Sequence, residues 1–94
     1  MFQIAWDPDK NSWLKNTRGI TFEEIVFFIE HGGLVEIIEH PNRDRFGHQM
    51  VLVMNILNYI YLVPFVIAKN GVFLKSIIPS RKMTKKYLER RAEK

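Results

Sequence analysis

The sequence predicts an α+β domain in which an N-terminal helical hairpin packs on one face of an antiparallel sheet. Two helix-start signals, at Asp7-Pro8 and at Thr21, fall in the first third of the chain. From Leu34 onward the pattern changes to a period of two, which is typical of strands. Turn residues separate these runs, and Asn70-Gly71 is a strong hairpin signal. Successive strands with short turns form an antiparallel meander, here of about four strands.

The helical hairpin is defined by its caps. A short strand at residues 2–6 leads to Asp7-Pro8, where Asp is a preferred N-cap and Pro suits the first helical position. Gly19 is placed to end this helix. Thr21 and Glu24 then form a capping box that opens the second helix, which carries a broad apolar face.

The strands and the last helix follow the hairpin. Because Pro64 has no N–H for a ladder, we expect it at an edge or a bulge. Thr84 is expected to cap a short basic helix. The expected strands are residues 34–39, 50–56, 59–68 and 72–78, with a polar connection at 40–48, a tight turn at Leu57-Asn58 and the last helix at 85–93.

Length and composition limit the functional classes. Ninety-four residues make a single domain, spanning residues 1–94. The absence of Cys excludes a disulfide framework and thiol catalysis. His31, His40 and His48 lack ligand spacing, so we expect neither a metal nor a cofactor. The N-terminus has no basic region followed by an apolar run, so we expect no signal peptide and a cytoplasmic location.

Residues 49–68 contain no charge and are long enough to span a bilayer. However, this segment holds Asn55, Asn58 and Pro64 and divides into two alternating runs around Leu57-Asn58. We therefore expect two strands and no membrane partner.

Positive charge is concentrated near the C-terminus. Residues 1–68 carry five Lys/Arg and eight Asp/Glu, whereas residues 69–94 carry nine and two. Arg81 and Lys82 follow the break at Pro79, which places them at the exit of the last strand. An anionic partner, either nucleic acid or an acidic protein, would suit such a cluster, and a solvated helix face is the alternative. The cluster also includes Lys75, Lys85 and Lys86.

Tyr59, Tyr61 and Phe65 have the spacing of one strand face. Such a row favours a core position. A stacking platform for nucleic-acid bases is the alternative, and Tyr59 is its best candidate.

Taken in order along the chain, these residues resemble the BrnT family of bacterial toxins. The match runs nearly from end to end. It comprises Trp6-Asp7, Lys10-Asn11, Leu14, Arg18-Gly19-Ile20, Phe22-Glu23-Glu24, residues 75–82 (Lys-Ser-Ile-Ile-Pro-Ser-Arg-Lys), Thr84 and Tyr87. Arg18 departs from the family, because many members have His at this position.

The resemblance implies a RelE-like fold, metal-independent RNA cleavage that stops translation, and neutralisation by a small DNA-binding antitoxin. A homodimer, or a heterotetramer with the antitoxin, would be possible assemblies. The basic cluster would be a natural docking face for an acidic antitoxin segment.

RNA cleavage without a metal uses the 2′-OH of the substrate as nucleophile, so the protein must supply cations and an acid–base pair. Arg81 suits the phosphorane, because its guanidinium matches phosphate oxygens bidentately. Lys75, Lys82 and Arg45 are assisting candidates, and His48, or alternatively His40, is the acid–base candidate. The candidates for RNA binding are Lys82, Lys85, Lys86 and Tyr59.

A non-catalytic module is the second hypothesis. It would use the sheet edge and the basic helix to hold a protein or a nucleic acid without turnover. The basic C-terminal quarter and the lack of an unambiguous acid–base pair favour it.

Overall fold

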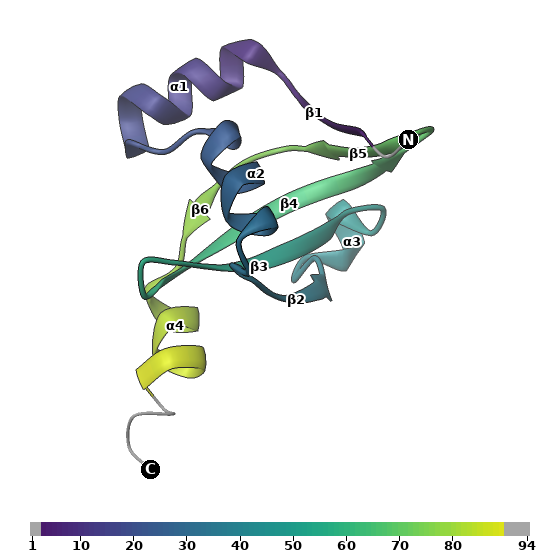
Figure 1. Ribbon diagram of the computed structural model, residues 1–94. Helices are drawn as coiled ribbons and strands as arrows, with labels where there is room; N and C mark the ends of the chain where they lie inside the picture. Colours follow the sequence, from purple (N-terminus) through teal and green to yellow (C-terminus); the bar gives the residue numbers. More distant parts are fainter. Residues whose placement is uncertain (1–2, 90–94) are drawn as a thin grey trace.

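The computed structural model describes residues 3–89, except for the side chains at positions 43, 46 and 89. Two helices lie over one face of a sheet, and a further helix extends from one end of the sheet (Figure 1). In chain order the elements are β1 (Gln3–Trp6), α1 (Pro8–Arg18), α2 (Phe22–Glu30), β2 (Leu34–Glu39), α3 (Arg43–Phe46), β3 (Met50–Ile56), β4 (Tyr59–Ala68), β5 (Gly71–Leu74), β6 (Ile78–Pro79), α4 (Arg81–Thr84) and the π-helical turn η1 (Lys85–Glu89).

The α+β class is confirmed, but the sheet is mixed and has six strands. Its order is β1-β5-β4-β3-β2, with β6 pairing with β4. β1 runs parallel to β5, from Gln3 beside Gly71 to Trp6 beside Leu74. The other pairs are antiparallel. The prediction of about four antiparallel strands is therefore wrong, because β1 joins the sheet and the last strand is divided.

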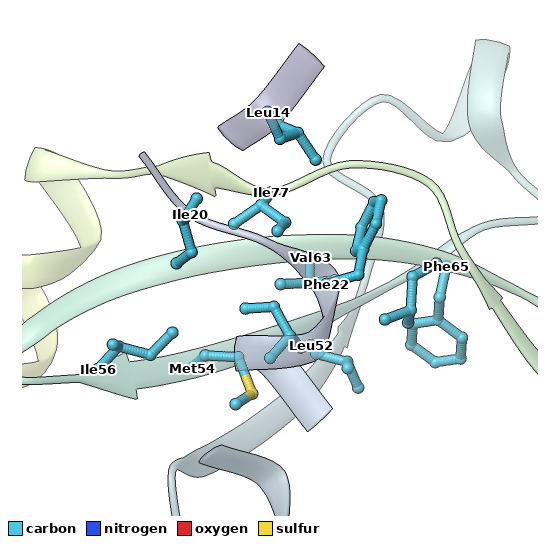
Figure 2. Packing of buried hydrophobic residues seen from close by; sticks show 11 residues of the cluster. Leu14, Ile20, Phe22, Leu52, Met54, Ile56, Val63, Phe65 and Ile77 are labelled. Carbon is cyan, nitrogen blue, oxygen red and sulfur yellow. The ribbon is translucent and has the colours of Figure 1, made fainter. Parts of the chain in front are cut away.

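The main core lies between the helices and one face of the sheet (Figure 2). Phe22 and Ile25 of α2 are fully buried, and so is Leu14 of α1. The ring of Trp6 stacks on that of Phe22 at a centroid distance of 5.6 Å, which joins β1 to α2. The sheet contributes Leu52, Met54, Ile56, Val63, Phe65, Leu74 and Ile77 to this cluster.

The capping box of α2 is confirmed. The N–H of Thr21 donates to Oε1 of Glu24 at 2.8 Å, and the N–H of Glu24 donates to Oγ1 of Thr21 at 3.2 Å. In the preceding helix, Asp7 caps α1 by accepting from the N–H of Asp9, and Gly19 ends it with a φ of 68°. That left-handed conformation suits Gly, which has no Cβ to oppose it.

Asn11 of α1 links this helix to the first turn of α2. Its Oδ1 accepts from the N–H of Phe22 at 2.8 Å, while its Nδ2 donates to Oε1 of Glu23 at 2.8 Å. One amide therefore satisfies an N-terminal donor of α2 and a carboxylate of its first turn. The hydrogen bond from Asn11 lowers the pKa of the Glu23 carboxyl below its usual value.

The predicted strand at residues 72–78 is wrong, because a bulge interrupts it. Leu74 pairs with Phe65 and Ile78 with Leu62, so three residues, 75–77, lie opposite two, 63–64. The carbonyl of Pro64 accepts from the N–H of Lys75 at 2.7 Å. In a strand the N–H and C=O of one residue point toward the same neighbouring strand. Since the carbonyl of Pro64 points toward the bulge, the missing N–H of Pro64 falls where the ladder is already interrupted. The expected bulge at Pro64 is thus confirmed.

The bulge changes which side chains face the core. With strict alternation Ile77 would share a face with Lys75. In the structure Leu74 and Ile77 are both buried, at 1% and 0% exposure, while Lys75 is exposed. The extra residue allows two apolar side chains three positions apart to enter the same core.

The last helix begins earlier than predicted. Ser80, not Thr84, is its N-cap, and its Oγ accepts from the N–H of Met83 at 3.1 Å. The turn that follows, η1, is π-helical over Lys85–Glu89. The remainder of the predicted helix, residues 90–93, lies outside the described residues, as does position 2 of the first strand.

The uncharged segment at residues 49–68 forms the β3–β4 hairpin. Leu57 and Asn58 make its tight turn, with φ of 52° and 66°, and Oδ1 of Asn55 accepts from the N–H of Asn58. No helix in the described part of the chain is long and apolar enough to cross a membrane. The polar connection before this hairpin contains the short helix α3.

Candidate nucleic-acid interface

Hydrogen bonds from the backbone of Ser80 and the side chain of Thr84 hold the start of α4 against β4. The N–H of Ser80 donates to the carbonyl of Ile60 at 3.0 Å, and the N–H of Ile60 donates to Oγ1 of Thr84 at 2.9 Å. Oγ1 of Thr84 in turn donates to the carbonyl of Ser80 at 2.7 Å. Thr84 is buried. These bonds fix the first turn of α4 on the rigid strand, so the side chains of that turn have a defined direction.

Four cations project from this anchored segment. Arg81, Lys82, Lys85 and Lys86 are all exposed, and we call them the basic surface. Arg81 and Lys85 are four residues apart, as are Lys82 and Lys86. Like charges at this spacing destabilise a helix by about 0.2–0.5 kcal/mol per pair. An anion bound across the surface would remove that repulsion.

The described carboxylates do not neutralise this surface. No carboxylate in the described part of the chain pairs with Arg81, Lys82 or Lys85. The ammonium of Lys86 lies 5.6 Å from the centroid of the Tyr87 ring. The Tyr87 hydroxyl donates to Oε2 of Glu36 in β2 at 2.6 Å, and this hydrogen bond raises the pKa of Tyr87 above its ordinary value. This hydrogen bond ties η1 to β2. Both α4 and η1 are therefore anchored to the sheet.

Tyr59 is the first residue of β4 and precedes Ile60, whose backbone anchors α4. It pairs with Ile56, so its side chain shares the face of the sheet that carries the main core. Its ring packs edge-on against Tyr61 at a centroid distance of 5.7 Å, and both rings are half-buried. Tyr61 packs against the core, as expected for the aromatic row. Tyr59 retains an accessible part at the start of β4, one residue before Ile60, which anchors α4.

Lys75 lies apart from α4, at the start of the bulge. Its ammonium is 5.3 Å from the centroid of the Phe73 ring. Phe73 pairs with Val66, on the face of the sheet opposite the main core. Lys75 is therefore exposed on that face, separated from Arg81 by the bulge and β6.

Arg45 and His48 are not brought together with Arg81. Both lie in the connection before β3, and Met50 at the start of β3 pairs with Phe65. The anchor of α4, Ile60, pairs with Asn55. Met50 and Asn55 are five residues apart along β3, which corresponds to about 17 Å. Nδ1 of His40 accepts from the N–H of Asn42 in the same connection.

A second group of cations, on α1, was not predicted from the sequence. Nη1 of Arg18 donates to the carbonyl of Ile77 at 2.6 Å, so α1 is tied to the bulge just before β6. The same guanidinium carbon lies 5.1 Å from the centroid of the Trp13 ring, and the Lys10 ammonium lies 4.5 Å from it. The Trp13 side chain is 44% exposed. An exposed indole between two cations is typical of surfaces that contact nucleic-acid bases. The interleaving of Lys10, Trp13 and Arg18 on one helix is the signal that could have found it.

No three His, Asp or Glu side chains in the described part of the chain gather in a way that could hold a metal ion. The guanidinium and ammonium groups of the basic surface are hydrogen-bond donors that suit phosphate oxygens.

Searches of protein-family models, curated proteins and solved structures found no match to this chain. The resemblance to BrnT toxins accordingly stays a prediction.

Proposed function

We propose that this protein binds RNA through the basic surface on α4 and η1. The observation that carries the proposal is the set of four exposed cations on a segment fixed by Thr84 and Ser80 to β4. Phosphates spaced along a single strand would bridge cations that otherwise repel one another. The anchoring means that little ordering of the backbone is needed on binding.

Aromatic side chains favour single-stranded RNA over a duplex. Trp13 and Tyr59 have accessible rings, the first beside Arg18 and the second at the start of β4, one residue before Ile60, which anchors α4. Bases can stack on such rings only when they are not paired within a helix. Stacking contributes about 1–3 kcal/mol per base and tolerates many sequences.

Binding can be tested by fluorescence anisotropy with labelled RNA strands of about 12 nucleotides, within the site sizes typical of single-strand binders. The variant Arg81→Ala/Lys85→Ala should weaken binding and reduce the slope of log K against log salt by about 0.7 per lost phosphate contact. Lys69→Ala, an exposed cation in the β4–β5 turn, is the matched control and should leave the slope unchanged. An equal salt slope in all three proteins would contradict the proposal.

We propose as a second candidate that the bound RNA is cleaved, as in the toxin function that the resemblance implies. The 2′-OH would attack phosphorus, the 5′-oxygen would leave, and the products would be a 2′,3′-cyclic phosphate and a 5′-OH. Arg81 supports this candidate, because it stands at the exit of β6 on an anchored turn. A RelE-like arrangement of the sheet belongs to the same candidate.

The acid–base pair of such a reaction would have to come from near α4. Arg45 and His48 precede Met50, whose level in the sheet is about 17 Å from that of Ile60, the anchor of α4, so the sheet does not hold them beside the first turn of α4. Incubating the purified protein with RNA and a metal chelator tests the candidate. A cyclic phosphate product that disappears in Arg81→Ala supports cleavage, while intact RNA under conditions that saturate binding supports the non-catalytic alternative.

An antitoxin that docks an acidic segment on the basic surface also stays a proposal. It would compete with RNA for Arg81 and Lys85. Charge reversal at these two positions should then weaken the protein complex and RNA binding together.

A further inference from the structure

The face of the sheet that carries the main core is not fully covered by α1 and α2. A cavity of about 190 Å³ crosses the sheet from β2 to β1 and is open to solvent. Its lining is entirely apolar and comes from all five strands of the main path as well as from α2. Its residues include Ile4, Ile29, Ile37, Leu52, Phe65 and Val72.

Two side chains extend this apolar floor into solvent. Ile37 is 50% exposed, and Ile67 is 78% exposed. Ile67 pairs with Val72, so both side chains are on the same face of the sheet as the cavity. Exposed apolar side chains that adjoin an apolar cavity, rather than standing singly, indicate a binding surface.

A second cavity continues the first along α2. Its volume is about 380 Å³, and it shares Ile4 with the apolar cavity. Glu23, Val26 and Glu30 line it from one side of α2, at the spacing of a single helix face, and Trp6 lines it from β1. One wall of the combined groove is thus acidic while its floor is apolar.

We propose that the two cavities form one docking groove for an amphipathic helix of a partner protein, with apolar side chains on one face and Lys or Arg along its flank. The lysines or arginines would pair with Glu23 and Glu30, and the apolar face would cover Ile37, Val72 and Ile67. This proposal does not depend on RNA binding, because the groove and the basic surface lie at different ends of the sheet. Ile60, the anchor of α4, and Ile67 are seven residues apart along β4, or about 23 Å.

The form of the floor favours a helix. It consists of side chains on the face of a sheet, which offers no backbone hydrogen bonds to a ligand. The occupant must therefore satisfy its own N–H and C=O groups, which a helix does internally. Crossing five strands requires about 19 Å, or a helix of about 13 residues.

A partner protein suits the groove better than a second copy of this chain. The complementary basic segment of this chain is α4 with η1, at the other end of the sheet. A contact between that segment of one copy and the groove of another would be heterologous. Such head-to-tail contacts build open filaments unless a ring closes. Tyr87 of that segment is also already bonded to Glu36.

The test uses two labelled helical peptides of about 14 residues with the same leucine pattern, one with lysine and the other with glutamate at the polar positions. The lysine peptide should bind the full-length protein at least tenfold more tightly. Ile67→Lys, which inserts a cation at the groove, should weaken that binding about tenfold. Leu57→Lys is the matched control, since Leu57 is 85% exposed in the β3–β4 turn.

Glu30→Gln should also weaken binding of the lysine peptide, and unfolding midpoints check that each variant is folded. Equal affinity for both peptides, or equal binding by Ile67→Lys and Leu57→Lys, would overturn the proposal. So would concentration-dependent self-association that Ile67→Lys abolishes, because it would identify a second copy as the occupant. Since no RNA is present, failure of the RNA-binding proposal would not alter these outcomes.

Discussion

The hydroxyl of Thr84 joins the C-terminal helix to the sheet through the backbone of Ile60. The N–H of Ile60 donates to Oγ1 of Thr84 at 2.9 Å, although the two residues are 24 positions apart. Thr84 is only 7% exposed. The residue that sequence alone assigned to a helix cap is thus a structural anchor, and the direction of the basic surface depends on it.

Replacing Thr84 by Val should reduce the free energy of unfolding by about 1–3 kcal/mol, because a buried N–H of Ile60 loses its acceptor while the side-chain volume is kept. Denaturant unfolding measures this change. Thr17→Val is the control, since the Thr17 hydroxyl donates to the carbonyl of Trp13 on the exposed side of α1. A loss in Thr84→Val no larger than in Thr17→Val would show that the anchor contributes little.

Arg18→Ala should lower both stability and RNA affinity. It removes the hydrogen bond to the carbonyl of Ile77, at about 1 kcal/mol for a partly buried bond, and a cation beside Trp13. Chemical denaturation and anisotropy with the same labelled RNA measure the two effects. Lys15→Ala, another exposed cation of α1, should affect stability much less. Unchanged RNA affinity in folded Arg18→Ala would remove α1 from the interface.

Gly71→Ala should detach β1 from β5. A Cβ at this position would overlap the backbone of Gln3, where the two parallel strands approach closely. The backbone of β1 would have to shift away from β5 to make room for the Cβ, so the stacking of Trp6 on Phe22 should loosen. Tryptophan fluorescence and the unfolding midpoint report the change. Lys69→Ala in the same turn should leave both unchanged, and a fully native Gly71→Ala would contradict the parallel register.

Glu23 should contribute to acid sensitivity. The hydrogen bond from Asn11 lowers the pKa of Glu23 in the folded state, which favours the carboxylate. The resulting stabilisation is present above the ordinary pKa of 4.5 and is lost as pH falls through the lowered value. The drop in urea midpoint between pH 7 and about pH 3 should therefore be smaller in Glu23→Gln than in the wild type. An identical drop in the two proteins would show that this bond does not stabilise the fold.

Local features of the fold were predictable from sequence, whereas long-range features were not. The capping box of Thr21 and Glu24 and the turn at Leu57-Asn58 depend on residues close in the chain, and both are present. The parallel pairing of β1 with β5 joins segments nearly seventy residues apart, and no local pattern indicates it. The bulge opposite Pro64 was expected in kind, but its effect on Ile77 depends on the partner strand.

The candidate site shows the same division. The cations of α4 were found because they are adjacent in sequence, whereas Arg45 and His48 were grouped with them on residue type alone. Ser80 and Thr84 are both good N-cap residues, and only the pairing of Ser80 with Ile60 decides between them. The hydrogen bond from Arg18 to Ile77 could not be predicted, because its acceptor is a backbone carbonyl 59 residues away.

The most direct test of RNA binding at α4 is an NMR titration of the labelled protein with single-stranded RNA, following every backbone amide. The largest shift changes should fall on residues 80–88, with smaller changes at Trp13 and Tyr59 and none at residues 40–48. Largest changes at residues 40–48, or no changes at residues 80–88 under saturating RNA, would contradict the account.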